Sequence, residues 1–266
     1  MSKLIKLGCV NLLLINLVVA QSNVSTFQDF DNQYNLGFSY AQGGLINGHY
    51  QLSNYTEQAL NLEVERLFDN KIWFDTNFNM VTAYNQPNLG NLNGGDNSGI
   101  PFGQNPFYFG LKFKTGYAFE VVENHLLLTP YVLFGGTTNW ATSSVIASGS
   151  KNLTALYFYT GGLGARVSYR INSAILLYFD QAYVYNWDNS GAIKEIQSDP
   201  RFYGKSYAAT NYMFNSTLGS RFNLYKNLQL GLNGFYSNFQ PQSNVAASVY
   251  LPTNSYGVMA SIGLTY

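Results

Sequence analysis

The stretch SYGVMASIGLTY, from Ser255 to Tyr266, alternates between two kinds of side chain over its whole length. In an extended strand successive side chains point to opposite faces, so one face of this stretch would be small or polar. The other face would be apolar and aromatic, with Tyr256, Val258, Ala260, Ile262, Leu264 and Tyr266. The open edge of such a strand needs a partner, and the alternating segment 34–41 can supply it.

The composition of the 266-residue chain favours a membrane exterior. Only 11% of the residues are charged and 17% are aromatic, whereas a soluble protein carries about 25% charged residues. After residue 20, no segment reaches the roughly 18 consecutive apolar residues of a membrane-spanning helix. A closed β-barrel is then the remaining way to satisfy every backbone polar group in lipid.

The first 20 residues have the pattern of a cleaved secretory signal peptide. Lys3 and Lys6 precede an apolar run at 12–19, and Ala20 provides a small residue at the cleavage site. Cleavage would also remove Cys9, the only cysteine, so the mature chain would have no disulfide and no thiolate ligand. It would keep 12 basic and 14 acidic residues, a net charge of −2, which does not indicate a nucleic-acid-binding surface.

The remaining chain is predicted to be a short periplasmic lead-in at 21–32, without periodic structure, followed by one barrel domain at 33–266. Four tight turns, each containing an asparagine, alternate with longer loops and are spaced by 54, 48 and 55 residues: Asn70, Asn124, Asn172 and Asn227. This spacing indicates hairpins. Ten strands are predicted, with eight or twelve as open alternatives: 34–41, 56–68, 72–84, 107–121, 126–138, 153–170, 174–187, 207–223, 228–239 and 255–266.

One predicted strand, 126–138, has an ambiguous phase, because Leu127, Tyr131 and Leu133 compete with a second apolar set offset by one residue. Pro130 in this strand favours a weakly paired position. The glycines at 161, 162 and 164 are expected to make room for crowded side chains inside the barrel rather than to bind phosphate.

A final strand of alternating apolar residues that ends in an aromatic residue resembles the C-terminal signature of bacterial outer-membrane β-barrel proteins of the small, porin-like class. The resemblance implies an antiparallel up-and-down transmembrane barrel in the Gram-negative outer membrane, with short periplasmic turns and long extracellular loops. It also implies lipid contacts, aromatic girdles that include Trp73, Trp140 and Trp187, and an assembly signal recognised by the barrel-assembly machinery. The signal would comprise Tyr256, Val258, Ile262, Leu264 and Tyr266. A soluble barrel is the alternative, but its apolar face would point inward.

Charged residues of both signs fall on the polar faces of the predicted strands. We predict that ten of them line the lumen: Glu63, Glu65, Asp75, Lys112, Lys114, Glu120, Arg166, Arg170, Asp180 and Arg221. They form either a selectivity ring in a narrow pore or an ion-pair network that fills a small barrel. Arg166 and Asp180 are expected to lie diagonally across one hairpin, and Lys114 could neutralise Glu65 and Asp75.

Catalysis is not expected. The sequence contains two histidines, His49 and His125, and neither stands in the Asp and His arrangement of omptin-type proteases. No metal site or cofactor is predicted. The sequence thus predicts a non-enzymatic barrel whose charge-lined lumen passes small solutes or ions. The alternative is a surface adhesin that binds a host or surface ligand through its loops at 85–106 and 188–206.

Overall fold

The computed structural model describes residues 25–47, 50–84, 107–142, 153–188, 210–225, 227–241 and 250–266. The predicted signal peptide, His49 and the loop residues 85–106 and 189–206 lie outside these ranges, as do the side chains of Trp140 and Trp187.

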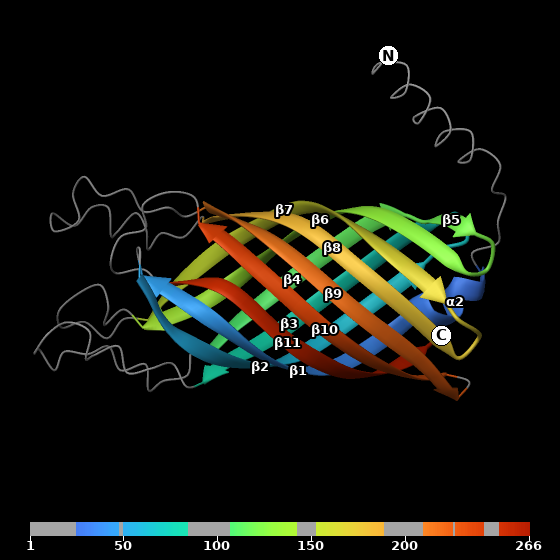
Figure 1. Cartoon of the computed structure of the whole chain (residues 1–266), viewed down its shortest axis with the longest axis horizontal. Helices are drawn as coiled ribbons and strands as arrows, with labels where there is room; N and C mark the ends of the chain where they lie inside the picture. Colours follow the sequence, from blue (N-terminus) through green and yellow to red (C-terminus); the bar gives the residue numbers. More distant parts are fainter. Residues whose placement is uncertain are drawn as a thin grey trace, which may run out of the picture.

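The described residues form one closed, antiparallel, up-and-down β-barrel (Figure 1). Each strand pairs with its neighbours in the chain, and the last strand pairs with the first, as the sequence predicted. The strands are β1 (Gln33–Asn47), β2 (Tyr50–Leu67), β3 (Ile72–Tyr84), β4 (Phe107–Tyr117), β5 (Phe119–Val122), β6 (Leu126–Thr142), β7 (Leu153–Arg170), β8 (Ile175–Asp188), β9 (Thr210–Tyr225), β10 (Leu228–Pro241) and β11 (Tyr250–Thr265).

β4 and β5 are two parts of one barrel strand, because both pair with β6, so the barrel has the ten strands that were predicted. Pairing to β6 stops after Gly116–Tyr131 and resumes at Phe119–Leu128. Pro130 lies opposite this gap, and proline has no N–H to donate. The amide of Ala118 instead donates to the carbonyl of Lys71 at 2.8 Å. The expected weak pairing at Pro130 is therefore confirmed.

The apolar faces of the strands point outward and the small or polar faces point into the lumen. On β1, Tyr34 and Phe38 are 54% and 55% exposed, whereas Asn35 and Ser39 are each 8% exposed. On β6 the phase is now resolved, because Leu127, Tyr131 and Leu133 are buried in the lumen and Val132 and Phe134 lie outside. This distribution confirms the predicted barrel and excludes the soluble alternative, in which the aromatic face would form the core.

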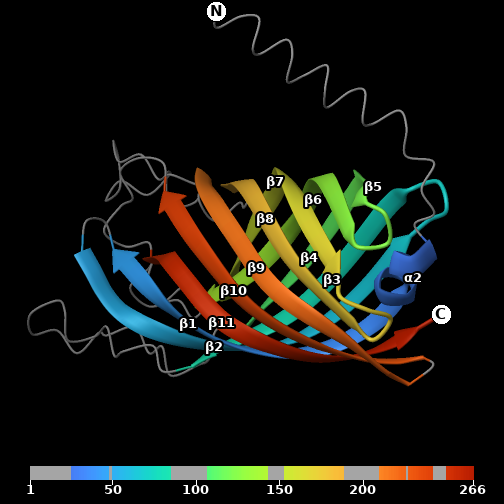
Figure 2. The ribbon, with the colours of Figure 1, turned by 45° about the vertical axis from the view of Figure 1, so that its right-hand side comes forward.

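The segment before β1 differs from the predicted lead-in without periodic structure, since Ser25–Asp31 forms a helix, α2. Phe27 and Phe30 of α2 are fully buried and join an apolar cluster with inward-facing Leu67 and Leu127. Figure 2 shows α2 at the end of the barrel where the chain also terminates. This end, which carries the tight turns between strands, is called the turn end below. The helix fills the turn end of the lumen.

Glycines in the lumen make room for two tyrosines that lie across it. A Cβ added at Gly164 would overlap the ring of Tyr131, and one added at Gly219 would overlap the ring of Tyr178. The predicted role of Gly164 is therefore confirmed.

We expect the substitution Gly164→Ala to lower the free energy of unfolding by about 1 to 3 kcal/mol, because Tyr131 must leave its position. Gly234 is the matched control, since an added Cβ there meets no atom within 4 Å. Gly234→Ala should change stability by about 0.5 kcal/mol or less. Urea titrations of the two variants make the comparison, and equal stabilities would contradict the packing argument.

Candidate functional site

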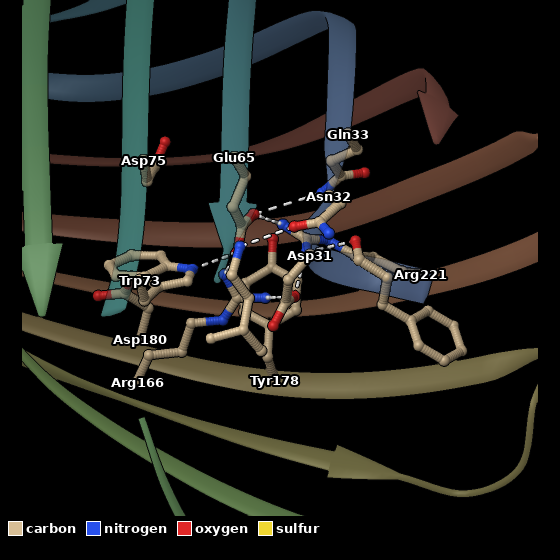
Figure 3. Close-up of polar contacts among 12 residues, drawn as sticks. Asp31, Asn32, Gln33, Glu65, Trp73, Asp75, Arg166, Tyr178, Asp180 and Arg221 are labelled. Carbon is tan, nitrogen blue, oxygen red and sulfur yellow. Dashed lines mark hydrogen bonds and ion pairs between the residues drawn. The ribbon is translucent and has the colours of Figure 1, made fainter. Parts of the chain in front are cut away.

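The most extensive polar cluster among the described residues lies inside the barrel at the level of α2 (Figure 3). Alternation along each strand points these charged side chains into the lumen. Their contacts show that they meet at one level of it. Four buried residues form what we call the lumen ion network: Asp31 of α2, Glu65 of β2, Arg166 of β7 and Arg221 of β9.

The two arginines of the lumen ion network each contact both carboxylates. Asp31 Oδ1 lies 2.8 Å from Arg221 Nη1 and 3.3 Å from Arg166 Nη2. Arg166 Nη1 and Arg221 Nη2 bind the two oxygens of Glu65. The four charges balance, as buried charges require.

Neutral side chains complete the surroundings of the network. Trp73 Nε1 donates to Glu65 Oε1 at 2.7 Å, and Gln33 Nε2 donates to Glu65 Oε2 at 3.3 Å. The Arg166 guanidinium carbon lies 4.3 Å from the centre of the Tyr178 ring and 5.6 Å from that of Trp73. These rings fix the position of the guanidinium through cation–π contacts.

Burial and the two arginines shift the pKa of the Asp31 carboxyl in α2 in opposite directions. Burial raises the pKa of the Asp31 carboxyl to about 7, and the Glu65 carboxylate adds to the rise, whereas Arg166 and Arg221 oppose it. The arginine contacts thus favour the charged form of the helix carboxyl, although burial and Glu65 together outweigh them and the pKa stays above its usual range.

A second ion cluster lies beside the first. Lys114 Nζ is 3.0 Å from Asp180 Oδ2 and 3.2 Å from Asp75 Oδ2. The Tyr131 hydroxyl donates to the other oxygen of Asp180. Lys114 also lies 5.9 Å from the centre of the Trp73 ring, which stands between the two clusters. Charged and aromatic side chains therefore extend across the lumen.

Several predicted lumen residues are brought together, but not in the predicted pairs. Arg166 is directly opposite Asp180 in the register of β7 and β8, not diagonal to it, and it binds Glu65 and Asp31 instead. Lys114 binds Asp75 as expected, but its second partner is Asp180 rather than Glu65. The physical reason is that side chains in a narrow barrel reach across the lumen as easily as along the sheet.

The other predicted lumen residues have different positions. Glu63 is at the edge of the network, 3.6 Å from Arg221 Nη2, and Lys112 is half-buried opposite Asn77. Glu120 and Arg170 lie near the turn after β5, not in a ring. Glu120 accepts a hydrogen bond from the amide of Asn124, and Arg170 Nη1 donates to the Asn124 carbonyl at 3.4 Å.

The sequence pattern misplaced one residue of the lumen clusters and did not indicate another. Trp73 was predicted in an interfacial girdle, but it is 1% exposed and lies in the lumen. Its position on the same strand face as Asp75 could have shown this. Asp31 was missed because it was assigned to the lead-in, although Phe27, Phe30 and Asp31 have the three- and four-residue spacing of one helix face.

The cluster provides guanidinium donors, carboxylates and aromatic faces. Guanidinium, carboxylate and aromatic groups of this kind bind and orient ions.

His125 is exposed, and its Nδ1 lies 3.1 Å from the carbonyl of Arg170. In the described ranges, no group of three or more His, Cys, Asp or Glu residues could hold a metal ion. No helix within those ranges is long and apolar enough to cross a membrane.

The outward apolar face, the closed ten-strand sheet and the polar lumen are the features of outer-membrane β-barrel proteins, and comparison with solved structures agrees. The β domain of the Bordetella autotransporter BrkA is 11% identical to this chain, with a TM-score of 0.52, and the match covers 89% of this chain and all of that domain. An outer-membrane channel of Pseudomonas putida F1 is 9% identical, with a TM-score of 0.40 and coverage of 88% and 96%. The attachment invasion locus protein Ail of Yersinia pestis is 14% identical, with a TM-score of 0.33 and coverage of 89% and 100%.

Because the sequence identities are low, these comparisons show a similarity of fold alone. No protein family matches the sequence, and no curated protein sequence matches it significantly. The chain thus has the fold of the small outer-membrane β-barrels.

Proposed function

We propose that this protein is a narrow channel of the Gram-negative outer membrane that passes small ions or solutes and is closed by α2. The turns would face the periplasm, and the apolar exterior would contact lipid. The observation that carries the proposal is the noncovalent contact of Asp31 with Arg166 and Arg221, which holds α2 against the lumen wall beyond its single connection to β1 through Asn32.

The chemistry of this contact favours a closure that can be released. A plug held by apolar packing alone would be at least as stable, because buried ion pairs lose hydration energy. Ion pairs, unlike a wholly apolar contact, can be exchanged for water and dissolved ions. Once α2 leaves, the wall behind it keeps Glu65, Arg166 and Arg221, which are groups suited to a hydrated path.

Recordings from the purified protein in planar lipid bilayers test the proposal. The wild-type protein should open rarely. The variant Asp31→Ala loses the helix side of the ion pairs, which costs the closed state about 3 kcal/mol, so the ratio of open to closed time should rise roughly a hundredfold.

Asp29 provides the matched control, since it belongs to the same seven-residue helix but is exposed. Asp29→Ala should behave like the wild-type protein. An Asp31→Ala variant that is folded but conducts no more than the Asp29→Ala control would refute the channel proposal.

We also propose that the last strand is recognised by the barrel-assembly machinery. In support, Tyr256, Val258, Ile262, Leu264 and Tyr266 all lie on the outer face of the barrel and are 48–63% exposed. Replacing Tyr266 with Asp should reduce the amount of folded protein in outer-membrane fractions several-fold. The same substitution should leave folding of the purified chain into detergent possible, and an unchanged amount in cells would count against this role.

The surface-binding alternative stays a prediction, because the loop residues on which it depends lie outside the described part of the chain.

A further inference from the structure

We infer that Arg166 and Arg221 form a carboxylate-binding site in the lumen wall, which Asp31 occupies as an internal ligand. When α2 is displaced, a small monocarboxylate anion takes its place. This inference rests on the proposed displacement of α2, and it adds the chemical class of an ion that the lumen binds.

The two arginines use different nitrogen atoms for the wall and for the helix. Arg166 Nη1 and Arg221 Nη2 hold Glu65, which belongs to the wall. Arg166 Nη2 and Arg221 Nη1 converge on one oxygen of Asp31. Arg221 Nη1 also donates to the Phe30 carbonyl at 3.1 Å, so its second acceptor is in α2 as well. Departure of α2 therefore frees donors on both guanidiniums at once, while Glu65 still holds the two arginines in position.

A further donor is already without a partner. Arg166 is only 3% exposed, and its buried Nε makes no hydrogen bond within the described structure. An unsatisfied buried donor is costly. A carboxylate has two oxygens and can accept from a guanidinium edge through both of them. An unattached anion could thus use Nε and Nη2 of Arg166 together, a geometry that the tethered Asp31 does not adopt.

The charges around the position of the Asp31 carboxylate favour binding of an anion with a single negative charge. With Asp31 gone, two guanidiniums face Glu65, and Glu63 lies 3.6 Å from Arg221 Nη2 at the edge. A monoanion restores the single negative charge that Asp31 gives the site, whereas a dianion would add a further negative charge beside Glu65 and Glu63. The ring of Tyr178 lies over both guanidiniums, so their edges rather than the faces that it covers carry the donors for an anion. A planar carboxylate fits such an edge.

Formate is the test anion, because Asp31→Ala removes from the protein a group equivalent to formate. At pH 8, sodium formate should raise the melting temperature of folded Asp31→Ala by about 3 to 6 °C at roughly ten times its dissociation constant. Sodium chloride at the same ionic strength should not do so. Formate should have no such effect on Asp29→Ala, in which the site is still occupied.

The wild-type protein provides a second measurement that needs no destabilised variant. Formate competes with Asp31 for the arginines, so it should increase channel opening several-fold over chloride in planar bilayers. If formate and chloride act alike in both measurements, the carboxylate site is refuted, even where Asp31→Ala opens the channel. If formate stabilises Asp31→Ala but that variant does not conduct, the site stands and the channel proposal fails.

Discussion

Replacing Arg221 with leucine is expected to lower the free energy of unfolding by about 3 to 5 kcal/mol. Arg221 is 3% exposed and binds Asp31 and Glu65. Its removal leaves two buried carboxylates to share Arg166, so one negative charge is uncompensated. Urea titration of the purified protein, followed by tryptophan fluorescence, measures the loss, since Trp73 donates to Glu65 in the same cluster.

A second substitution separates the missing charge partner from general disruption. In Arg221→Leu combined with Glu65→Gln, one carboxylate faces one guanidinium again, and the glutamine oxygen can still accept from Trp73. We expect this double variant to recover about 1 to 3 kcal/mol of the loss. A loss no larger than that of Arg66→Leu, which removes an exposed arginine, would show that the lumen ion network does not stabilise the barrel. Strictly additive effects would show that Arg221 and Glu65 are not coupled.

The alternation of side chains was sufficient to predict the barrel because lipid and lumen impose opposite polarity on the two faces of each strand. The predicted strands 72–84 and 153–170 coincide with β3 and β7. At the other rim, β1 extends to Asn47 and β2 begins at Tyr50, so both are longer than predicted. Alternation weakens there, but the backbone ladder continues, because hydrogen bonds between strands do not depend on the polarity of side chains.

The helix α2 illustrates what a local pattern does not determine. Seven residues make about two turns, too few for a reliable helical period, and isolated helices of this length are unstable in water. Its stability comes from the lumen, where Phe27 and Phe30 are buried and Asp31 meets two arginines. These contacts join parts of the chain more than a hundred residues apart, and the sequence alone does not supply that proximity.

The same limitation explains the ion pairs. The sequence predicted that Arg166 and Asp180 lie diagonally across one hairpin, whereas the register places them directly opposite. The register does not say how far the side chains reach across the lumen, and there Arg166 finds Glu65, which is 101 residues away. Predicting which residues face inward was therefore possible, whereas predicting their partners required the diameter of the barrel and the presence of Asp31.

An arginine on the outer face should reveal directly where the lipid lies. Leu163 of β7 is 66% exposed and lies well inside its strand, whereas Leu224 is 56% exposed and is the next-to-last residue of β9 at the turn end. In phospholipid vesicles, Leu163→Arg should lower the free energy of unfolding by about 2 to 4 kcal/mol, because it places a charge in the hydrocarbon layer.

Leu224→Arg makes the same chemical change near the polar headgroups, where we expect a cost of about 1 kcal/mol or less. Urea titrations of both variants in the same vesicles give the two costs, and their difference cancels the intrinsic effect of replacing leucine with arginine. Water around the whole exterior would make both costs small and equal. The proposed channel requires the unequal result, because a lumen can connect two compartments only if lipid surrounds the barrel between them.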